Sequence, residues 1–485
     1  MNSTALNQSM SSPEKLPLRA IPGDYGFSFF GPIKDRYDYF YSQGEDEFFR
    51  TRITKYKSTV FRTNMPPGPF ISSNSKVVAL LDSNSFPILF DTSKVEKTDI
   101  LDGTFMPSTS FFGGYRVCAF LDPSEPNHHL LKSLFLTFLA SSHQKFIPYF
   151  RTSLSELFER FPTENRRILT SIAITWRVNP SETKLKSEGP GITNTWLALQ
   201  LAPLGTLGIK YLPDFIDDII HTFRLPFFVV KPPGYKKLYN AVYDSATLLL
   251  DEAEKVGIKR DEACHNLVFV AGFNAFGGMK VLFPALIKWI GSARESLHRQ
   301  LAEEIRTVVK EEGGVTFSAL EKMPLTKSVV YEVLRIEPPV PYQYATAKED
   351  IVVESHDAAF EIKKGETIFG FQPFATKDPE VFNNPEEFVA DRFVGEGEKL
   401  LKYVYWSNAR ETESPTADNK QCPGKDLVVL CSRIMVVEFF LRYDTFTVEI
   451  GKLPLGASVK ITSFTMARNK SDDVIVTDCG QVTER

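Results

Sequence analysis

The chain has 485 residues, of which 43% are apolar and 24% are charged, and this composition excludes a disordered or low-complexity protein. With 56 Lys and Arg against 60 Asp and Glu, the net charge of −4 gives no bulk positive field that would attract nucleic acid. The length predicts two to three packing units or one large domain, and the 40 phenylalanines favour a large apolar interior.

The N-terminal residues 1–16 are polar and rich in Ser and Asn, and we expect them to form a flexible N-terminus. They contain no apolar run of the secretory type, and the first arginine is Arg19, so no plastid transit peptide is evident. The five cysteines are odd in number and widely spaced, without a CxxC pair, which favours a reducing compartment. We therefore expect a cytoplasmic location.

Further along, short β-like runs at residues 58–62, 69–72 and 77–81 precede a region of helical periodicity from about residue 240 to 340. One helix is expected over residues 297–308 and another over 324–337. Glycines 313 and 314 end the first, and prolines 338 and 339 end the second.

After residue 340, the residues from 351 to 371 predict a hairpin with its turn at Lys364 and Gly365. Residues 427–441 are apolar on nearly every side, which predicts a helix buried on all faces. The tail alternates again at residues 446–450 and 459–461, as β-strands do. The fold is therefore expected to be mainly helical with a small β portion.

Two apolar segments raise the question of a membrane. Residues 267–290 contain Asn274, Lys280, Pro284 and Lys288, which make a poor bilayer span and predict a buried helix pair instead. Residues 222–233 fit core, the lip of a ligand channel or a peripheral membrane contact, and the sequence does not choose among these three.

Cys422 stands in the run Asn-Lys-Gln-Cys-Pro-Gly-Lys-Asp, directly before the buried helix. The free N–H groups and the dipole of a helix N-terminus favour a thiolate at this position. The alternative is a structural buried cysteine.

Glu332 and Arg335 lie three residues apart on the 324–337 helix and so share one face. Together with Arg392, in the run Phe-Val-Ala-Asp-Arg-Phe, they can form a buried Glu/Arg/Arg network. A solvated helix pair is the alternative for Glu332 and Arg335 alone, but the ordered series of this pair, Arg392 and Cys422 is far more specific.

This series resembles the cytochrome P450 family. The resemblance implies a mainly α fold, a helical prism with a small β region and haem in the core. It also implies that the Cys422 thiolate is the axial ligand of the iron of haem b. Residues 17–468 would form a single haem domain, and residues 469–485 a C-terminal extension.

The helix that would face the iron lacks the acid–Thr pair with which a monooxygenase relays protons to dioxygen, because residues 271–278 read Ala-Gly-Phe-Asn-Ala-Phe-Gly-Gly. A substrate that already carries a peroxide bond needs no such relay. Asn274 could hydrogen-bond a hydroperoxide there, or it could be satisfied by the helix backbone.

Five runs resemble the plant branch of the family that metabolises fatty-acid hydroperoxides, which includes allene oxide synthases, hydroperoxide lyases and divinyl ether synthases. They are residues 16–27, 112–116, 121–128, 272–278 and 419–422. The resemblance implies that ferric haem homolyses the O–O bond of a lipoxygenase product, without dioxygen, NADPH or a reductase. Allene oxide synthases then oxidise the substrate radical and remove a proton, whereas lyases rebound hydroxyl.

Carried over by position, Asn274 would anchor the hydroperoxide and Lys280 would contact the substrate end of the pocket. Four further residues match positions around the haem propionates: Lys97, His128, Lys132 and Lys420. Part of the phenylalanine content would line an acyl channel, namely Phe105, Phe111, Phe112, Phe273 and Phe276.

Within the branch, residues 409–413 favour an allene oxide or divinyl ether synthase, and Ala275 with Gly277 and Gly278 favours the allene oxide type. Leu101 points toward a lyase, since many allene oxide synthases have Phe at this substrate-binding position. We expect allene oxide formation from 9- and/or 13-hydroperoxides of polyunsaturated fatty acids. The likeness to non-plastid members favours the 9-isomers.

The resemblance breaks at two places. Residues 159–178 match the family poorly and form a markedly shorter segment, so a non-catalytic or damaged copy is the competing hypothesis. Ala409 replaces a family glycine and would be strained if its backbone required a positive φ.

Overall fold

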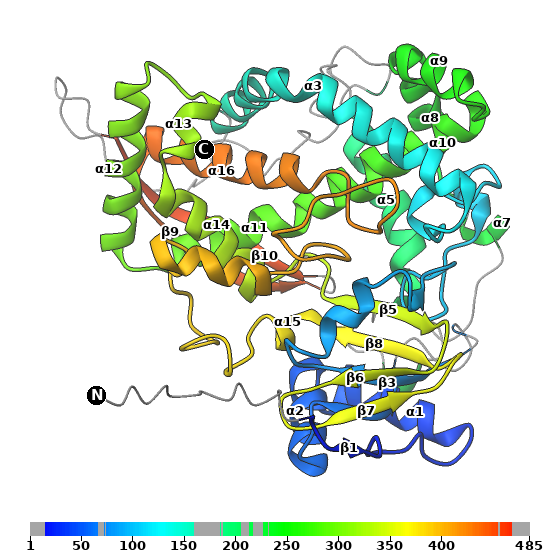
Figure 1. Ribbon diagram of the computed structural model, residues 1–485. Helices are drawn as coiled ribbons and strands as arrows, with labels where there is room; N and C mark the ends of the chain where they lie inside the picture. The colour runs from blue at the N-terminus through cyan, green and yellow to red at the C-terminus, as the bar shows by residue number, and fades with distance from the viewer. Residues whose placement is uncertain are drawn as a thin grey trace, which may run out of the picture.

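The computed structural model describes residues 15–65, 72, 74–159, 185, 188–204, 213–216, 227–230, 232–453 and 456–467. Its body is helical and its strands form small sheets, as the sequence predicted (Figure 1). The α-helices are α1 (Phe30–Tyr37), α2 (Glu45–Tyr56), α3 (Pro126–Glu159), α5 (Gly189–Leu201), α7 (Phe227–Val230), α8 (Tyr235–Ser245), α9 (Thr247–Lys255), α10 (Arg260–Phe269), α11 (Gly278–Gly291), α12 (Glu295–Glu311), α13 (Phe317–Glu321), α14 (Pro324–Ile336), α15 (Gln372–Ala375) and α16 (Lys425–Arg442). Short π-helical segments are η1 (Asp38–Ser42) and η8 (Val270–Gly277), and 3-10 segments are η2 (Phe86–Phe90), η3 (Thr109–Phe112), η4 (Cys118–Phe120), η7 (Ala202–Leu204) and η9 (Gly395–Tyr403).

Three sheets are present in the described part of the chain. The strands are β1 (Leu18–Arg19), β2 (Val60–Asn64), β3 (Lys76–Leu80), β4 (Val95–Glu96), β5 (Tyr342–Ala347), β6 (Ile351–Glu354), β7 (Ala359–Ile362), β8 (Thr367–Phe371), β9 (Tyr443–Leu453) and β10 (Gly456–Met466). Their orders are β2-β3-β8-β5-β4, β1-β7-β6 and β10-β9. The runs expected at 58–62 and 77–81 are β2 and β3, while most of the run at 69–72 lies outside the described residues. The alternating tail forms strands as predicted, and the structure pairs them with each other, with Val459 opposite Ile450.

The hairpin predicted from residue 351 to 371 is wrong in its turn. Strands β6 and β7 pair with each other around a turn at residues 355–358, where the Ser355 N–H donates to the Ala358 carbonyl. The turn at Lys364 and Gly365 instead leads into β8, which crosses to the larger sheet and pairs with β3 and β5. Every residue of β8 is buried, so this strand needs a central position that is covered on both faces.

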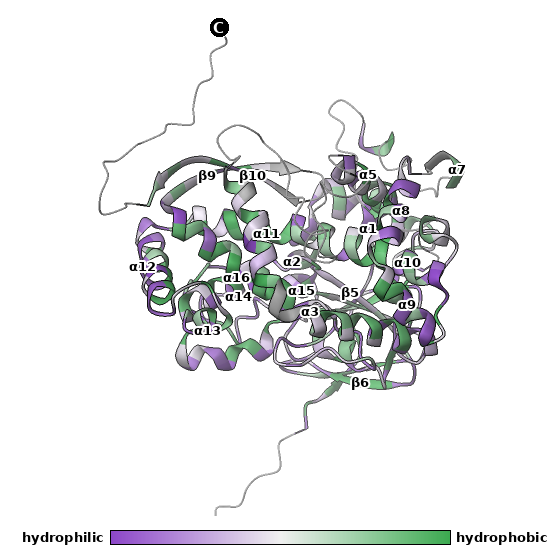
Figure 2. Cartoon of the chain, turned by 90° about the horizontal axis from the view of Figure 1, so that it is seen from above, coloured by the Kyte–Doolittle hydropathy of each residue, from purple (hydrophilic) through white to green (hydrophobic). Residues whose placement is uncertain are grey.

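Helix α16 lies in the core, and residues 429–440 are all buried, which confirms the predicted fully buried helix. It packs against α3, α12 and α14. Helix α12, by contrast, is amphipathic: Leu297, Leu301 and Ile305 are buried, and Figure 2 shows both hydrophobic and hydrophilic residues along it. The packing of α14 and α12 on α16 fixes the position of the segment that carries Cys422.

Residues 267–290 do not form the predicted helix pair. Helices α10 and α11 are joined through the π-helical segment η8 into one helical stretch from Arg260 to Gly291, which Pro284 does not end. The stretch is long and apolar enough to cross a membrane by length and composition alone, yet half of its most apolar window is buried in the protein. Because α11 packs against α14, α16, β9 and β10, we regard the stretch as a core helix.

Candidate functional site

The loop before α16 brings Cys422 to the start of that helix. The Lys425 N–H donates to the Cys422 carbonyl at 3.2 Å, and Gly424 is the N-terminal cap of α16. Burial raises the pKa of the Cys422 thiol, whereas the Gly424 N–H, the Lys132 charge and the Trp406 indole lower it. The Gly424 N–H at the helix N-terminus thus favours the thiolate, as the sequence predicted, and burial of the thiol opposes it. The penalty of burying the charge is larger than the gain.

A tight turn at residues 406–409 precedes this loop. The Trp406 N–H donates to the Ala409 carbonyl at 2.8 Å, and the Ala409 N–H donates back at 3.2 Å. Ser407 and Asn408 have φ values of 34° and 70°, which suits the two central residues of a type I′ turn. The positive φ does not fall on Ala409, so the strain considered for the Gly-to-Ala replacement does not arise.

Four basic residues from distant segments gather beside this loop. Lys97, His128 and Lys132 are buried and Lys420 is half-buried. Lys97 Nζ donates to Gln343 Oε1 at 3.2 Å and to Asn408 Oδ1, and Lys132 Nζ donates to Asn419 Oδ1 at 2.9 Å.

Lys420 Nζ donates to the carbonyls of Ala119 and Leu121, each at 2.7 Å. In the described part of the chain, the acceptors of the three ammonium groups are therefore uncharged carbonyl and amide oxygens.

The electrostatics of this basic cluster favour an anionic ligand. Burial, followed by the charge of Lys420, lowers the pKa of Lys97 to about 7, and burial lowers those of Lys132 and Lys420 to about 8. Burial also lowers the pKa of His128 to about 4, and its Nδ1 has no hydrogen-bond partner among the described residues. Buried cations beside a cysteine fit a group that carries both carboxylates and a thiolate-binding metal, as haem b does.

The lowered pKa of Lys97 makes the stability of the haem-free protein depend on pH. The folded-state pKa of about 7 lies below the ordinary 10.5, so the unfolded chain binds more protons between these values. We expect the free energy of unfolding to rise as the pH increases through this window, and Lys97→Met to flatten that rise. Urea unfolding of both proteins at several pH values measures the slopes, and equal slopes would contradict the prediction.

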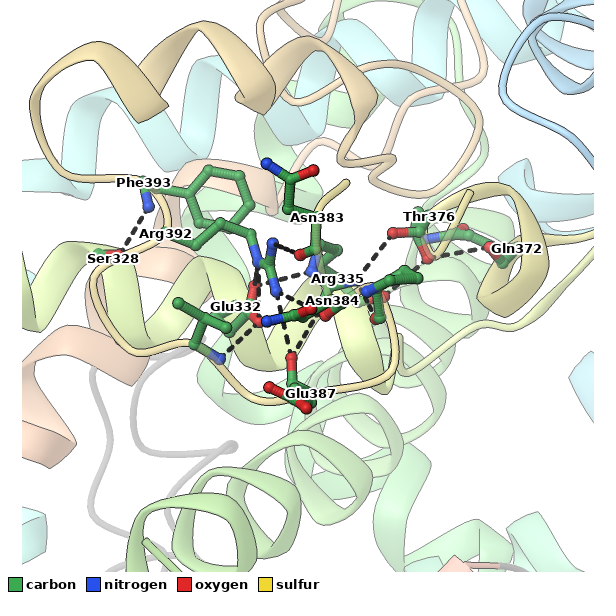
Figure 3. A network of polar contacts seen from close by, with 12 residues as sticks. Ser328, Glu332, Arg335, Gln372, Thr376, Asn383, Asn384, Glu387, Arg392 and Phe393 are labelled. Atoms are coloured by element: carbon green, nitrogen blue, oxygen red, sulfur yellow. Dashed lines mark hydrogen bonds and ion pairs between the residues drawn. The ribbon is translucent and has the colours of Figure 1, made fainter. Parts of the chain in front are cut away.

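Glu332, Arg335 and Arg392 form one network at the other side of α14 (Figure 3). The side chains of Glu332 and Arg335 are fully buried and joined by two hydrogen bonds of 2.7 and 2.8 Å. Arg392 Nε donates to both Glu332 oxygens at 3.0 Å. The geometry is that of a buried network and excludes the alternative of a solvated pair.

The remaining N–H groups of the two arginines bind the backbone of the segment that follows α15. Arg335 Nη1 donates to the carbonyls of Thr376 and Pro385, at 3.1 and 2.8 Å, and Arg392 Nη1 donates to Asn383 O at 2.7 Å. Figure 3 shows Thr376 and Asn383 beside the guanidinium groups, with dashed lines marking the contacts. The network thus attaches the irregular chain at 376–393 to the helix.

The predicted substrate residues lie along a second hydrophobic cluster. Phe111, Phe112 and Phe276 are buried members of this cluster, and Leu101 and Phe273 are partly buried and pack against it. Phe105 is also buried.

The two polar residues predicted for the substrate are both exposed. Asn274 lies in η8, and Lys280 Nζ donates to Asn194 Oδ1 on α5 at 2.9 Å. In the structure, the partner of the Lys280 ammonium group is therefore an amide oxygen of the protein.

Sequence reasoning missed the residues that hold the site in place. Glu411 is buried, accepts a 2.8 Å hydrogen bond from the Tyr331 hydroxyl, and its carbonyl accepts one from Lys425 Nζ at 2.8 Å. Glu411 thereby joins the family-typical run 409–413 to α14 and to the first residue of α16. Residues 409–413 were used in the sequence analysis only to choose among members of the plant branch. Nothing in that run indicated that Glu411 would contact Tyr331 and Lys425.

The family model described as Cytochrome P450 matches residues 294–407. A mainly helical fold with the buried network on α14, and with a cysteine directly before a core helix, defines a haem-thiolate protein of the cytochrome P450 class.

Curated relatives identify the group within this class. The chain is 57% identical over 473 residues to Allene oxide synthase 3 of Solanum lycopersicum, covering 94% of this chain and 96% of that protein. It is 52% identical over 469 residues to the chloroplastic allene oxide synthase of Arabidopsis thaliana (93% and 90%). With the 9-divinyl ether synthase of Capsicum annuum it shares 50% over 477 residues (95% and 99%). The chain belongs to the allene oxide synthase family of plant cytochromes P450, as its motifs predicted.

Proposed function

We propose that this chain is a hydroperoxide dehydratase that converts polyunsaturated fatty-acid hydroperoxides to allene oxides, a step of oxylipin and jasmonate biosynthesis. The observation that carries the proposal is the 51–57% identity with several allene oxide synthases along 93–95% of the chain. The reaction removes one molecule of water from the hydroperoxide without net electron exchange with another reactant, so it needs neither dioxygen nor NADPH, and we expect no reductase partner.

The chain's own residues have distinct roles in this proposal. Cys422 would supply the thiolate that binds the iron of haem b, and the basic cluster of Lys97, His128, Lys132 and Lys420 would hold the two propionates. When bound, haem supplies a ferric iron that cleaves the O–O bond homolytically. The protein is proposed to be one haem domain over residues 17–468.

The substrate is oriented by the helical stretch and the phenylalanine cluster. Asn274 donates its amide hydrogen to the hydroperoxide, and the cluster around Phe111 and Phe276 covers the acyl chain. Lys280 attracts the carboxylate end after releasing Asn194. These apolar walls exclude water, which would otherwise compete for the radical or cation derived from the substrate.

The reaction product distinguishes an allene oxide synthase from a divinyl ether synthase and from a hydroperoxide lyase. Purified haem-loaded protein, given a 9- or a 13-hydroperoxide, is expected to yield ketols, which form when water opens an allene oxide. The 50% identity with divinyl ether synthases makes a divinyl ether the second candidate product. Aldehydes alone would assign the chain to the lyases, and a rate ratio favouring the 13-isomer would overturn the proposed 9-preference.

Leu101 offers a test of product control, because its side chain packs against the same cluster as Phe273. An aromatic ring at this position would stabilise a substrate cation by about 1 kcal/mol, so we expect Leu101→Phe to raise the ratio of ketol to aldehyde about fivefold. Leu130→Phe, which adds a ring elsewhere in the cluster, is the matched control. Equal product ratios for the two variants would contradict this role of Leu101.

The residue range 159–178 bears on the competing hypothesis of a damaged copy, and residues 160–178 lie outside the described residues. A simple experiment separates the two hypotheses. An active enzyme gives a ferric Soret band and removes the diene absorbance of a hydroperoxide. Absence of haem after expression would favour the damaged copy.

A cytoplasmic location with peripheral membrane contact is proposed as well. The cysteines of the described residues are free thiols, which suits a reducing compartment. Within the apolar segment 222–233, residues 222–226 and 231 lie outside the described residues, but Phe228 on α7 is 82% exposed. Before this segment, Phe215 is 64% exposed. Such side chains suit a lipid surface. Failure of the protein to float with lipid vesicles would contradict the contact.

A further inference from the structure

The loop of residues 97–121 carries four of the side chains predicted to face the substrate, namely Leu101, Phe105, Phe111 and Phe112. Its regular structure is confined to the short 3-10 segments η3 and η4 and to an isolated bridge between Asp102 and Phe105. Because so little of the loop is held by helix or sheet hydrogen bonds, side-chain contacts must fix the positions of these four residues.

Arg116 joins the two ends of this loop. Near its beginning, Arg116 Nε donates to Asp99 Oδ1 at 2.7 Å. Near its end, Arg116 Nη2 donates to the Phe120 carbonyl at 3.0 Å. The Nη1 and Nη2 atoms also donate to the two carboxylate oxygens of Glu125, which directly precedes α3, at 2.6 and 3.0 Å. The planar fork of a guanidinium suits this simultaneous binding of two carboxylates.

Asp99 is the residue through which this clamp reaches Leu101. Its φ of 54° lies in the left-handed region, which Asp and Asn adopt more readily than other non-glycine residues. The Asp99 N–H donates to the Phe120 carbonyl at 2.9 Å, so backbone and side chain of Asp99 are both held. Leu101 follows two residues later and packs against the second hydrophobic cluster. The direction in which the chain leaves Asp99 therefore sets where Leu101 meets that cluster.

The exposure of the clamp indicates what it contributes. The side chains of Arg116, Asp99 and Glu125 are 30%, 48% and 30% exposed. Ion pairs with this exposure contribute little to the free energy of unfolding. The contacts therefore matter chiefly for the position of the loop.

We propose that Arg116 is a positioning residue that, through Asp99, fixes Leu101 beside the substrate and so controls hydroperoxide binding and the choice between dehydration and chain cleavage. The inference rests on the proposed function. A loop without the clamp lets Leu101 occupy several positions against the acyl chain, and the substrate is then held less well for loss of the proton that gives the allene oxide.

Arg116→Gln tests this, because it keeps a polar side chain and removes the fork that bridges Asp99 and Glu125. We expect the haem-loaded variant to keep its Soret band and to exchange the amide hydrogens of Leu101 and Phe105 faster. Its kcat/KM for the preferred hydroperoxide should fall about tenfold, mainly through a higher KM. Its ratio of ketol to aldehyde should fall about threefold, and aldehyde should appear if the unmodified protein forms none.

Arg50→Gln is the matched control. Arg50 lies on α2, outside the loop, and likewise binds two carboxylates, since its Nε donates to Asp46 Oδ2 at 2.5 Å and its Nη2 donates to Glu386 Oε1 at 2.6 Å. This variant should change neither KM nor the product ratio.

Asp99→Asn is a second, milder variant. Asparagine keeps the side-chain shape, suits the positive φ and leaves Arg116 bound to Glu125, so this variant should fold and take up haem. We expect smaller changes in KM and product ratio, in the same directions as for Arg116→Gln.

Values of KM and product ratio that match those of Arg50→Gln in both loop variants would overturn the inference, even if their melting temperatures were lower. If Arg116→Gln takes up no haem, the result for Asp99→Asn decides. Absence of ketol from the unmodified, haem-loaded protein would instead contradict the proposed function. The two failures are therefore distinguishable.

Discussion

Cys422→Ser is expected to abolish the thiolate-type Soret band and to reduce hydroperoxide consumption to background. Loss of groups that merely support a metal ligand commonly lowers affinity or activity about 10–100-fold, and removal of the ligand itself should exceed that. A serine hydroxyl at this buried position has no comparable tendency to ionise. The absorption spectrum after haem loading and the decay of diene absorbance measure the two effects.

Cys431→Ala is the matched control for this experiment. It removes another buried thiol, which lies on α16 nine residues beyond Cys422, and burial raises the pKa of that thiol as well. We expect this variant to keep its Soret band and its activity. A Cys422→Ser protein that still shows a thiolate-type spectrum would disprove the axial role of Cys422.

Arg335→Ala is expected to destabilise the protein by about 3–5 kcal/mol, because Glu332 would keep a buried charge with only Arg392 beside it. This loss is a large part of a typical total of about 5–15 kcal/mol. We expect a much lower yield of soluble protein and a clearly lower melting temperature, which thermal unfolding of the haem-loaded protein measures.

Two variants separate network loss from the loss of any ion pair. Arg335→Lys keeps the charge but not the paired geometry of the guanidinium, so its stability should fall between those of the wild type and Arg335→Ala. Glu396→Ala breaks the exposed pair with Lys399, where the side chains are 90% and 78% exposed, and should change stability by less than about 1 kcal/mol. Similar melting temperatures for Arg335→Ala and Glu396→Ala would contradict the structural role.

Local patterns in the sequence predicted those parts of the molecule that depend on neighbouring residues. The spacing of Glu332 and Arg335 is a property of one helix, and the apolar run in α16 already implies burial on all sides. The alternation at residues 446–450 and 459–461 likewise indicated the strands β9 and β10, although it did not predict that they pair with each other. For these elements the periodicity alone was sufficient.

Contacts between distant segments were beyond such reasoning. Lys97 meets Gln343 and Asn408, which lie 246 and 311 residues further along the chain, and nothing near Lys97 indicates either partner. The crossing of β8 to another sheet was missed for the same reason. The basic cluster was predicted only through the family resemblance, and the resemblance gave no indication that Arg116 joins Asp99 to Glu125.

The basic cluster also links the stability of the fold to its proposed ligand. Without a counter-ion the buried cations of this cluster repel one another, and the propionates of haem, bound there as proposed, would offset that repulsion. A ligand that binds only the folded state stabilises that state, and the gain in the free energy of unfolding grows with the logarithm of the free haem concentration. Newly made chains that do not bind haem are therefore expected to unfold more often and to be degraded by proteases. The amount of enzyme would then follow the supply of its cofactor.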